Sequence, residues 1–277
     1  MTQTTVAFLG CGSMGTAILA GMIRSGTKPE NIRVTTKSVD SAKELADKFG
    51  VTAFATEYQP NANSLAVEGA DIVLVAVKPA YVVEVLEEVR SVISKEALVV
   101  SVAAGIEIQT MENHLPDSVS VIRAMPNTPA LIQEGLTGIS KGSRVTQQQL
   151  ELSVTLFEAV GKTMVIPESQ IDALSTISGS GPAYVFYFIE EFIKTAVSHG
   201  FSSEEAYLLV SQTFLGASEL LVQSQGDPAE LRRQVTSPNG TTMKAIAVLQ
   251  EGNLNDLFFK ATSAALARAK EIAQEQK

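Results

Sequence analysis

The first half of the sequence alternates short apolar runs with stretches of helical periodicity. The apolar runs are residues 6–9, 32–35, 71–77, 97–103, 119–123 and 136–140, and helical stretches cover 16–24, 41–49 and 81–92. Strands that are apolar on both faces and alternate with helices are typical of a parallel sheet covered by helices. We therefore expect an α/β fold, with a doubly wound, Rossmann-like domain over residues 1–166.

Beyond residue 166 the pattern is helical. Helical stretches cover 171–175, 182–199, 203–223, 228–234, 242–250 and 255–274, and predict an all-α domain over residues 167–277. The helix that begins AYVFYFIEEF is apolar almost all the way round, so it must be enclosed. It could be a central core helix, but we favour a homodimer formed through this domain, because about a hundred residues provide little interior.

The composition argues against several classes of function. The formal charge is 21 − 30 = −9 without a cluster of basic residues, so nucleic acid is not an expected partner. No run approaches the roughly 20 apolar residues of a membrane span. The chain starts without a basic, signal-like segment, so we expect a cytoplasmic protein. Cys11 is the single cysteine and there are two histidines, so we expect no metal site.

The strongest local motif is VAFLGCGSMG, in which Gly10, Gly12 and Gly15 form G-x-G-x-x-G between a predicted strand and a predicted helix. In dinucleotide-binding domains the first glycine permits a tight turn, the second admits the pyrophosphate and the third lets the helix pack closely. The amides of the helix N-terminus then face the phosphates. A glycine turn without a ligand is the alternative.

The end of the second strand indicates which dinucleotide binds. An NAD enzyme carries Asp or Glu there, whereas this sequence has Thr36, Lys37 and Ser38. Two hydroxyls and an ammonium can hold a 2′-phosphate, and Asp40 lies too far along the chain for a ribose contact. We therefore predict NADP as the cofactor, with NADPH preferred over NADH. A solvated lysine in a turn is the alternative.

Two further segments follow predicted strands, at the edge where ligands bind in such sheets. VLVAVKP ends in Lys78 and Pro79, and Lys78 would either border the cofactor or lie on the surface. The loop RAMPNTP has two prolines around Asn127, which make it stiff enough to hold a nicotinamide ring and a small substrate. A purely structural turn is the alternative.

The helical half contains two polar segments that precede helices. SGSGPAYVF predicts a glycine-rich loop, with Ser180 or a neighbour as the helix cap and Pro182 in the first turn. In LRRQVTSPNGTTMKAIAVLQE, a hydroxyl-rich loop opens a helix at Thr241 and Thr242. The free amides and the dipole of that helix favour an anion such as a carboxylate. Simple capping is the alternative for this segment taken alone.

Together with GCGSMG, VAVKP, SVAAGI and RAMPNTP, these two segments resemble the pyrroline-5-carboxylate reductase family, from Val6 to about Ala269. VTSPNGTTMKAIAVLQ and SGSGPAY are its most specific motifs. The resemblance implies NAD(P)H-dependent reduction of the cyclic imine 1-pyrroline-5-carboxylate to L-proline, the last step of proline biosynthesis. It also implies that the helical halves pair two subunits, often within larger rings of dimers.

The resemblance assigns roles motif by motif. With Thr36, Lys37 and Ser38, the cofactor site would comprise Leu9, Gly10, Cys11, Gly12, Ser13, Met14, Gly15, Asn63, Ala76, Val77, Lys78, Pro79, Ala103 and Asn127. The substrate carboxylate would bind at Ser237, Asn239, Gly240, Thr241 and Thr242. Asn239 stands where some relatives have glycine, so it must adopt the backbone angle that this position requires.

Thr242 is the one candidate catalytic residue. A protonated imine is already electrophilic, so the enzyme has mainly to position the reactants. Positioning lowers the activation free energy by at most about 7–11 kcal/mol. Thr242 would orient the imine nitrogen, because a threonine hydroxyl is a poor proton donor at neutral pH.

Two other functions fit a similar two-domain plan. A β-hydroxyacid dehydrogenase would need a lysine in G-x-G-x-x-x-K, but Val185 stands at that position after Gly179 and Gly181. A non-catalytic dinucleotide-binding protein is the other alternative, and the hydroxyls of Thr241 and Thr242 argue against it.

Overall fold

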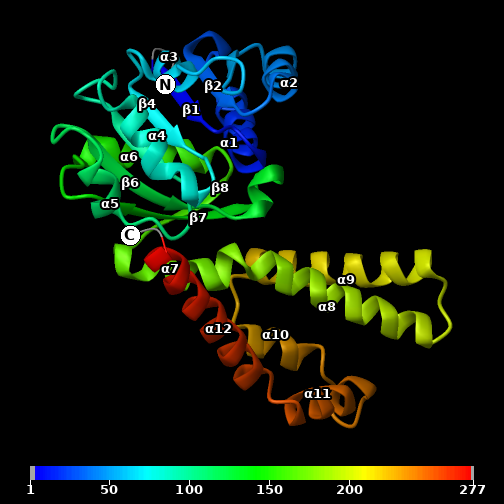
Figure 1. Cartoon of the computed structure of the whole chain (residues 1–277). Helices are drawn as coiled ribbons and strands as arrows, with labels where there is room; N and C mark the ends of the chain where they lie inside the picture. The colour runs from blue at the N-terminus through cyan, green and yellow to red at the C-terminus, as the bar shows by residue number, and fades with distance from the viewer. Residues whose placement is uncertain (1–3, 276–277) are drawn as a thin grey trace. The chain divides into compact units, whose positions relative to one another are not determined.

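The computed structural model describes residues 4–275, and an eight-stranded sheet lies at the centre of its N-terminal part (Figure 1). The strand order is β3-β2-β1-β4-β5-β6-β7-β8. The strands are β1 Val6–Leu9, β2 Ile32–Thr36, β3 Thr52–Ala55, β4 Ile72–Val75, β5 Leu98–Ser101, β6 Ser120–Met125, β7 Gly135–Lys141 and β8 Gly161–Val165. The first six strands are parallel, which confirms the predicted Rossmann-like sheet.

Helices cover both faces of the sheet (Figure 1). They are α1 Ser13–Arg24, α2 Val39–Phe49, α3 Ala62–Val67, α4 Val82–Val89, α5 Ile108–Asn113, α6 Gln147–Glu158 and α7 Ile171–Leu174. Val6 and Phe8 of β1 pack in the core with α1, α2 and α6, whereas Ala7 and Leu9 pack in the core with α3, α4 and α5. All four residues of β1 are fully buried in these two cores, which explains why the strand is apolar on both faces.

Strand β7 runs antiparallel to β6, contrary to the expected parallel arrangement. The connection over residues 126–134 contains only a short 3₁₀ turn, Thr128–Ile132. A parallel neighbour needs a crossover of about a dozen residues or more, so this short loop can only reverse the chain direction. Strand β8 then pairs parallel to β7, after the crossover through α6.

The prediction of a glycine-rich loop at SGSGPAYVF is wrong, because this segment is helical from its start. Residues Ser175–Gly179 form a π-helical turn, which continues α7 and leads directly into α8, Gly181–Ser198. Glycines lower helix propensity but do not forbid helical backbone angles. Short π-helical turns occur frequently at functional sites.

The chain forms two compact units. One holds the sheet and comprises the described residues up to Ser180 and from Ala265 on, and the other is Gly181–Ala264. The predicted domain division at residues 166 and 167 stays a prediction. None of the helices within residues 4–275 is long and apolar enough to cross a membrane.

The second unit is helical, as predicted. Besides α8 it contains α9 Ser203–Ser224, α10 Pro228–Gln234, α11 Thr241–Glu251 and the first part of α12 Leu254–Glu275. Helices α8 and α9 lie side by side (Figure 1), with the rings of Phe192 and Phe214 6.5 Å apart. Of residues 181–264, only Ala206 and Val210 are buried.

Candidate functional site

The loop after β1 forms a tight turn. Gly10 has φ +78°, and its N–H donates to the Thr35 hydroxyl at 3.0 Å. The Cys11 N–H donates to the Thr35 carbonyl at 2.7 Å, which ties this loop to β2. A Cβ on Gly10 would collide with the side chain and backbone of Val77, so the loop lies against the segment after β4. The first glycine therefore forms the tight turn that the motif predicts, and it also lies close to the segment after β4.

The other two glycines of the motif have different surroundings. A Cβ on Gly12 would meet no atom of the described residues within 4 Å, whereas one on Gly15 would lie 3.2 Å from Cys11 Sγ and 3.5 Å from Ala76 Cβ. Gly12 is the N-cap of α1 and makes no side-chain cap, and both Gly12 and Ser13 are exposed, so the first amides of the helix remain available to an anion. Ser13 and Met14 belong to that turn, and their cofactor contacts stay a prediction.

Cys11 lies within this loop but is buried. Burial raises the pKa of its thiol to about 11, and a weak hydrogen bond with the Thr16 hydroxyl, 3.9 Å from Sγ, opposes the rise. At neutral pH the thiol is therefore protonated. It adds no negative charge where a pyrophosphate would bind.

The hydroxyls of Thr36 and Ser38, predicted to hold a 2′-phosphate at the end of β2, form hydrogen bonds within their own turn. Thr36 Oγ1 donates to the Ser38 carbonyl at 2.9 Å, and Ser38 Oγ donates to Ser41 Oγ at 3.0 Å while capping α2. Both hydroxyl hydrogens are thus used locally. The ammonium of Lys37 is exposed, so it is the group in this turn best able to attract a phosphate.

Sequence reasoning missed Glu57 at the same turn. Its Oε1 accepts a hydrogen bond from the N–H of Val39, the first residue of α2, at 2.9 Å. Glu57 follows β3, which the apolar pattern did not identify because three of its four residues are exposed or half-buried. No local motif marks this contact.

Asn63 lies at the start of α3 and is buried. Its Nδ2 donates to Glu88 Oε2 of α4 at 2.7 Å, and Glu88 Oε1 is buried without a hydrogen-bond partner in the described part of the chain. The side-chain amide of Asn63 is therefore anchored to α4. Its predicted contribution to the cofactor site stays a prediction.

The segments after β4 and β5 border the loop after β1. The Ala76 N–H donates to the Leu9 carbonyl at 2.8 Å, and Leu9 itself is fully buried. Ala76 and Val77 are half-buried, while Lys78 is exposed and precedes the 3₁₀ turn Pro79–Tyr81. Ala103, just beyond β5, is buried.

Asn127 is held by three hydrogen bonds. Its Nδ2 donates to the carbonyl and to Oγ of Ser178, at 3.2 and 3.1 Å, and its Oδ1 accepts from the Leu136 N–H at 2.8 Å. The side chain therefore fixes the proline-rich loop to the π-helical turn Ser175–Gly179. Its predicted contribution to the cofactor site stays a prediction.

A buried arginine that sequence reasoning missed, Arg123, lies in β6, just before the loop that contains Asn127. Arg123 of β6 is 3% exposed and pairs with Asp172 of α7 at 2.5 Å and with Glu168 at 3.5 Å. Arg123 and Asp172 line a cavity of about 300 Å³ beside the ends of β5 and β6, together with Ala104, Met125 and Thr176. The only sequence signal was a basic residue inside an apolar strand.

The helical unit holds the predicted substrate loop. The Gly240 N–H donates to the Ser237 carbonyl at 3.0 Å, and Asn239 adopts φ +60°, the left-handed conformation that Asn tolerates better than most residues. Helix α11 begins at Thr241, and its N-cap Gly240 supplies no side-chain cap. Thr241 and Thr242 are exposed. This exposed, uncapped helix N-terminus can accept a carboxylate.

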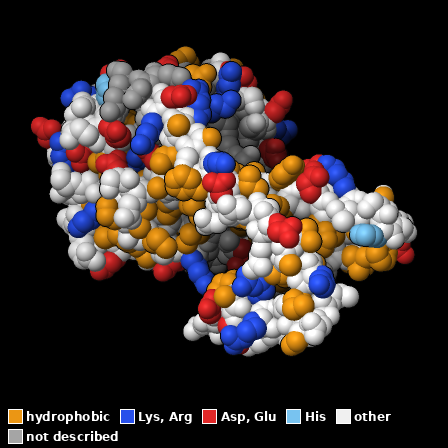
Figure 2. Space-filling view, turned by 90° about the horizontal axis from the view of Figure 1, so that it is seen from below, with side chains coloured by type: hydrophobic (Ala, Val, Ile, Leu, Met, Phe, Trp, Pro, Cys, Tyr) orange, Lys and Arg blue, Asp and Glu red, His pale blue; other side chains and the backbone are white. Residues whose placement is uncertain are grey.

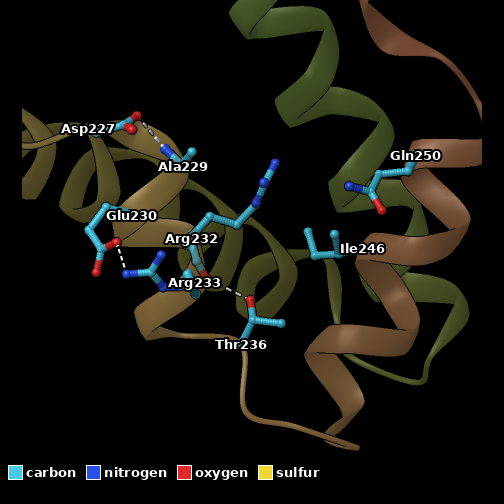
Figure 3. A pocket seen from close by; sticks show the side chains of 8 residues that line it. All are labelled: Asp227, Ala229, Glu230, Arg232, Arg233, Thr236, Ile246 and Gln250. Atoms are coloured by element: carbon cyan, nitrogen blue, oxygen red, sulfur yellow. Dashed lines mark hydrogen bonds and ion pairs between the residues drawn. The ribbon is translucent and has the colours of Figure 1, made fainter.

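A separate cavity of about 380 Å³ lies between α10 and α11 (Figure 3). Arg232 projects into the space between the two helices, whereas Arg233 pairs with Glu230. Thr236 lines the cavity, but the predicted substrate residues that follow it do not. Within residues 4–275, no group of three or more His, Cys, Asp or Glu side chains is placed to hold a metal ion.

The chain is similar to known proteins over its whole length. The family described as pyrroline-5-carboxylate reductase dimerisation matches residues 168–272, and that described as NADP oxidoreductase, coenzyme F420-dependent, matches residues 5–105. A pyrroline-5-carboxylate reductase of Corynebacterium melassecola is 38% identical over 275 residues, which cover 98% of this chain and 100% of the relative.

Two solved structures are also similar. The structure of a pyrroline-5-carboxylate reductase from Coxiella burnetii has a TM-score of 0.90 and 38% identity, covering 97% of this chain and 98% of the other. The Plasmodium falciparum pyrroline carboxylate reductase, crystallised with NADP bound, has a TM-score of 0.86 and 27% identity, covering 99% of each chain.

Proposed function

Because the chain belongs to the pyrroline-5-carboxylate reductase family, we propose that it reduces 1-pyrroline-5-carboxylate to L-proline with a nicotinamide dinucleotide bound at the carboxyl edge of its sheet. The observation that carries the cofactor assignment is the loop after β1, where the exposed Gly12 precedes the uncapped amides of α1. We also propose that it works in the cytoplasm, because a chain with Cys11 as its single cysteine forms no internal disulfide that would call for an oxidising compartment.

The side chains of the loop after β1 and those of the loop before α11 suit the positioning of reactants better than acid–base chemistry. When bound, the reduced dinucleotide supplies the hydride that converts the C=N bond of the imine into an amine. The uncapped amides of α11 and the hydroxyl of Ser237 would hold the substrate carboxylate. Thr242 would orient the imine nitrogen, and the proton would come from solvent or be present on the substrate already.

We propose NADPH as the preferred form of the cofactor. The support is Lys37, whose exposed ammonium lies in the turn after β2 where a 2′-phosphate would bind. The relative from Plasmodium falciparum that was crystallised with NADP is a full-length match, which agrees with this proposal.

The activity itself is tested by adding 1-pyrroline-5-carboxylate to the purified protein and NADPH. We expect NADPH oxidation only when the imine is present, with L-proline as the product. A β-hydroxyacid dehydrogenase would instead respond to a hydroxyacid with the oxidised cofactor. A non-catalytic binding protein would bind NADPH without oxidising it.

Replacing Thr242 with alanine is expected to lower kcat about tenfold, because one orienting hydrogen bond of about 1.4 kcal/mol is lost. The affinity for NADPH, measured by fluorescence titration, should not change. A matched control is Thr155→Ala, which removes an exposed hydroxyl on α6 that donates to the Glu151 carbonyl. Equal kcat values for both variants would remove Thr242 from the proposed site.

We propose that the helical unit forms a homodimer. Only Ala206 and Val210 are buried among residues 181–264, and hydrophobic side chains are exposed on the surface (Figure 2). Phe186, Leu208 and Phe259 are each at least 66% exposed, which is unusual for a chain without a partner. Light scattering should give about twice the 29.4 kDa chain mass, or a larger even multiple. A stable, active species of 29.4 kDa would contradict the dimer.

A further inference from the structure

A carboxylate occupies the N-terminus of α2, in the turn that we propose to hold the adenosine ribose. The Val39 N–H, the first amide of α2, donates to Glu57 Oε1 at 2.9 Å. The backbone holds Glu57 in place, because the Glu57 N–H donates to the Lys37 carbonyl at 3.1 Å and the Thr56 N–H donates to the Thr36 carbonyl at 2.9 Å. All these residues belong to the sheet unit, and both Val39 and Glu57 are exposed.

The two cofactor forms would interact differently with this carboxylate. A 2′-phosphate carries a charge of about −1.5 to −2 at neutral pH and prefers the free amides of a helix N-terminus. Glu57 already uses the Val39 amide, so the phosphate would have to displace it or lie beside a like charge. The ribose 2′-hydroxyl of NADH is instead a donor that a carboxylate accepts.

We propose that Glu57 determines cofactor selectivity by lowering the preference for NADPH over NADH. Its carboxylate competes with the 2′-phosphate for the Val39 amide and accepts a hydrogen bond from the 2′-hydroxyl of NADH. Lys37 acts in the opposite direction, so the selectivity is the difference between the two effects. This inference rests on the proposed binding of the dinucleotide at this edge of the sheet.

The test compares Glu57→Gln with the unchanged protein. Glutamine has nearly the same size, and its side-chain oxygen can still accept from the Val39 N–H, so the turn should keep its conformation. We expect kcat/KM for NADPH to rise about tenfold relative to kcat/KM for NADH, since one like charge beside the phosphate is removed. The effect should shrink at high salt, because the turn is exposed.

Two further variants separate charge from shape. Glu57→Asp keeps the charge on a shorter side chain, so it should keep the selectivity much closer to that of the unchanged protein than Glu57→Gln does. Lys37→Ala should lower the ratio of NADPH to NADH efficiency about tenfold, the opposite of Glu57→Gln. As a control, Glu158→Gln at the end of α6 removes an exposed carboxylate outside this turn and should leave the ratio unchanged.

A binding measurement makes the test independent of turnover. Calorimetric titration with adenosine 2′,5′-bisphosphate should give a Kd about tenfold lower for Glu57→Gln than for the unchanged protein. An unchanged Kd and an unchanged cofactor ratio, in a variant with the same melting temperature, would overturn the role of Glu57. Absence of imine-dependent NADPH oxidation in the unchanged protein would refute the proposed function instead, and the titration would still decide on Glu57.

Discussion

Gly12→Ala is expected to fold like the unchanged protein and to bind NADPH at least about tenfold more weakly. Gly12 has φ −84°, which alanine adopts without strain, and a Cβ there meets nothing within 4 Å in the part of the chain that the structure describes. The added methyl group would therefore point at the pyrophosphate, which needs the backbone of the second glycine to come close. Fluorescence titration with NADPH and a thermal unfolding curve measure the two effects separately.

The matched comparison is Gly10→Ala. Gly10 has φ +78°, and a Cβ there would run into Val77, so this substitution should destabilise the loop itself. Gly10→Ala should lower the melting temperature, whereas Gly12→Ala should not. Normal NADPH affinity in Gly12→Ala would show that the pyrophosphate does not lie over this turn.

Asp172→Asn is expected to lower the free energy of unfolding by about 3 kcal/mol. The guanidinium of Arg123 is 3% exposed, so losing the carboxylate at 2.5 Å leaves a buried charge that Glu168, at 3.5 Å, compensates only in part. Urea unfolding followed by circular dichroism measures the change. We expect the turn after β1, where we propose that the cofactor binds, to be unaffected in the folded variant.

Asp117→Asn provides the matched control. Asp117 pairs with Arg144 at 3.2 Å, but its side chain is fully exposed, and such pairs contribute at most about 1 kcal/mol. The two substitutions make the same chemical change in opposite environments. Equal effects on the unfolding free energy would mean that Arg123 does not depend on Asp172.

The sequence predicted those strands whose neighbours bury them on both faces. β1, β4 and β5 are buried throughout, so they appear as continuous apolar runs. The strands at the two edges of the sheet, β3 and β8, were missed because most of their residues are exposed or half-buried. Helix α6 was also missed, and the direction of β7 depends on the length of its connection rather than on its own residues.

The site was predictable where its residues are close in sequence. The turn at Gly10 and the left-handed Asn239 both follow from short motifs. The contacts that sequence reasoning missed join distant segments: Arg123 and Asp172 are 49 positions apart, and Val39 and Glu57 are 18 apart. Such pairs depend on how the strands are ordered in the sheet, which no local pattern encodes.

The nearly coreless helical unit has a thermodynamic consequence. With Ala206 and Val210 as the only buried residues among positions 181–264, this unit gains little stability from its own side chains. If a second copy supplies the missing burial, folding of the unit and association of the chains are one equilibrium governed by mass action. Dilution would then melt these helices first, while the sheet, with its own two cores, would persist.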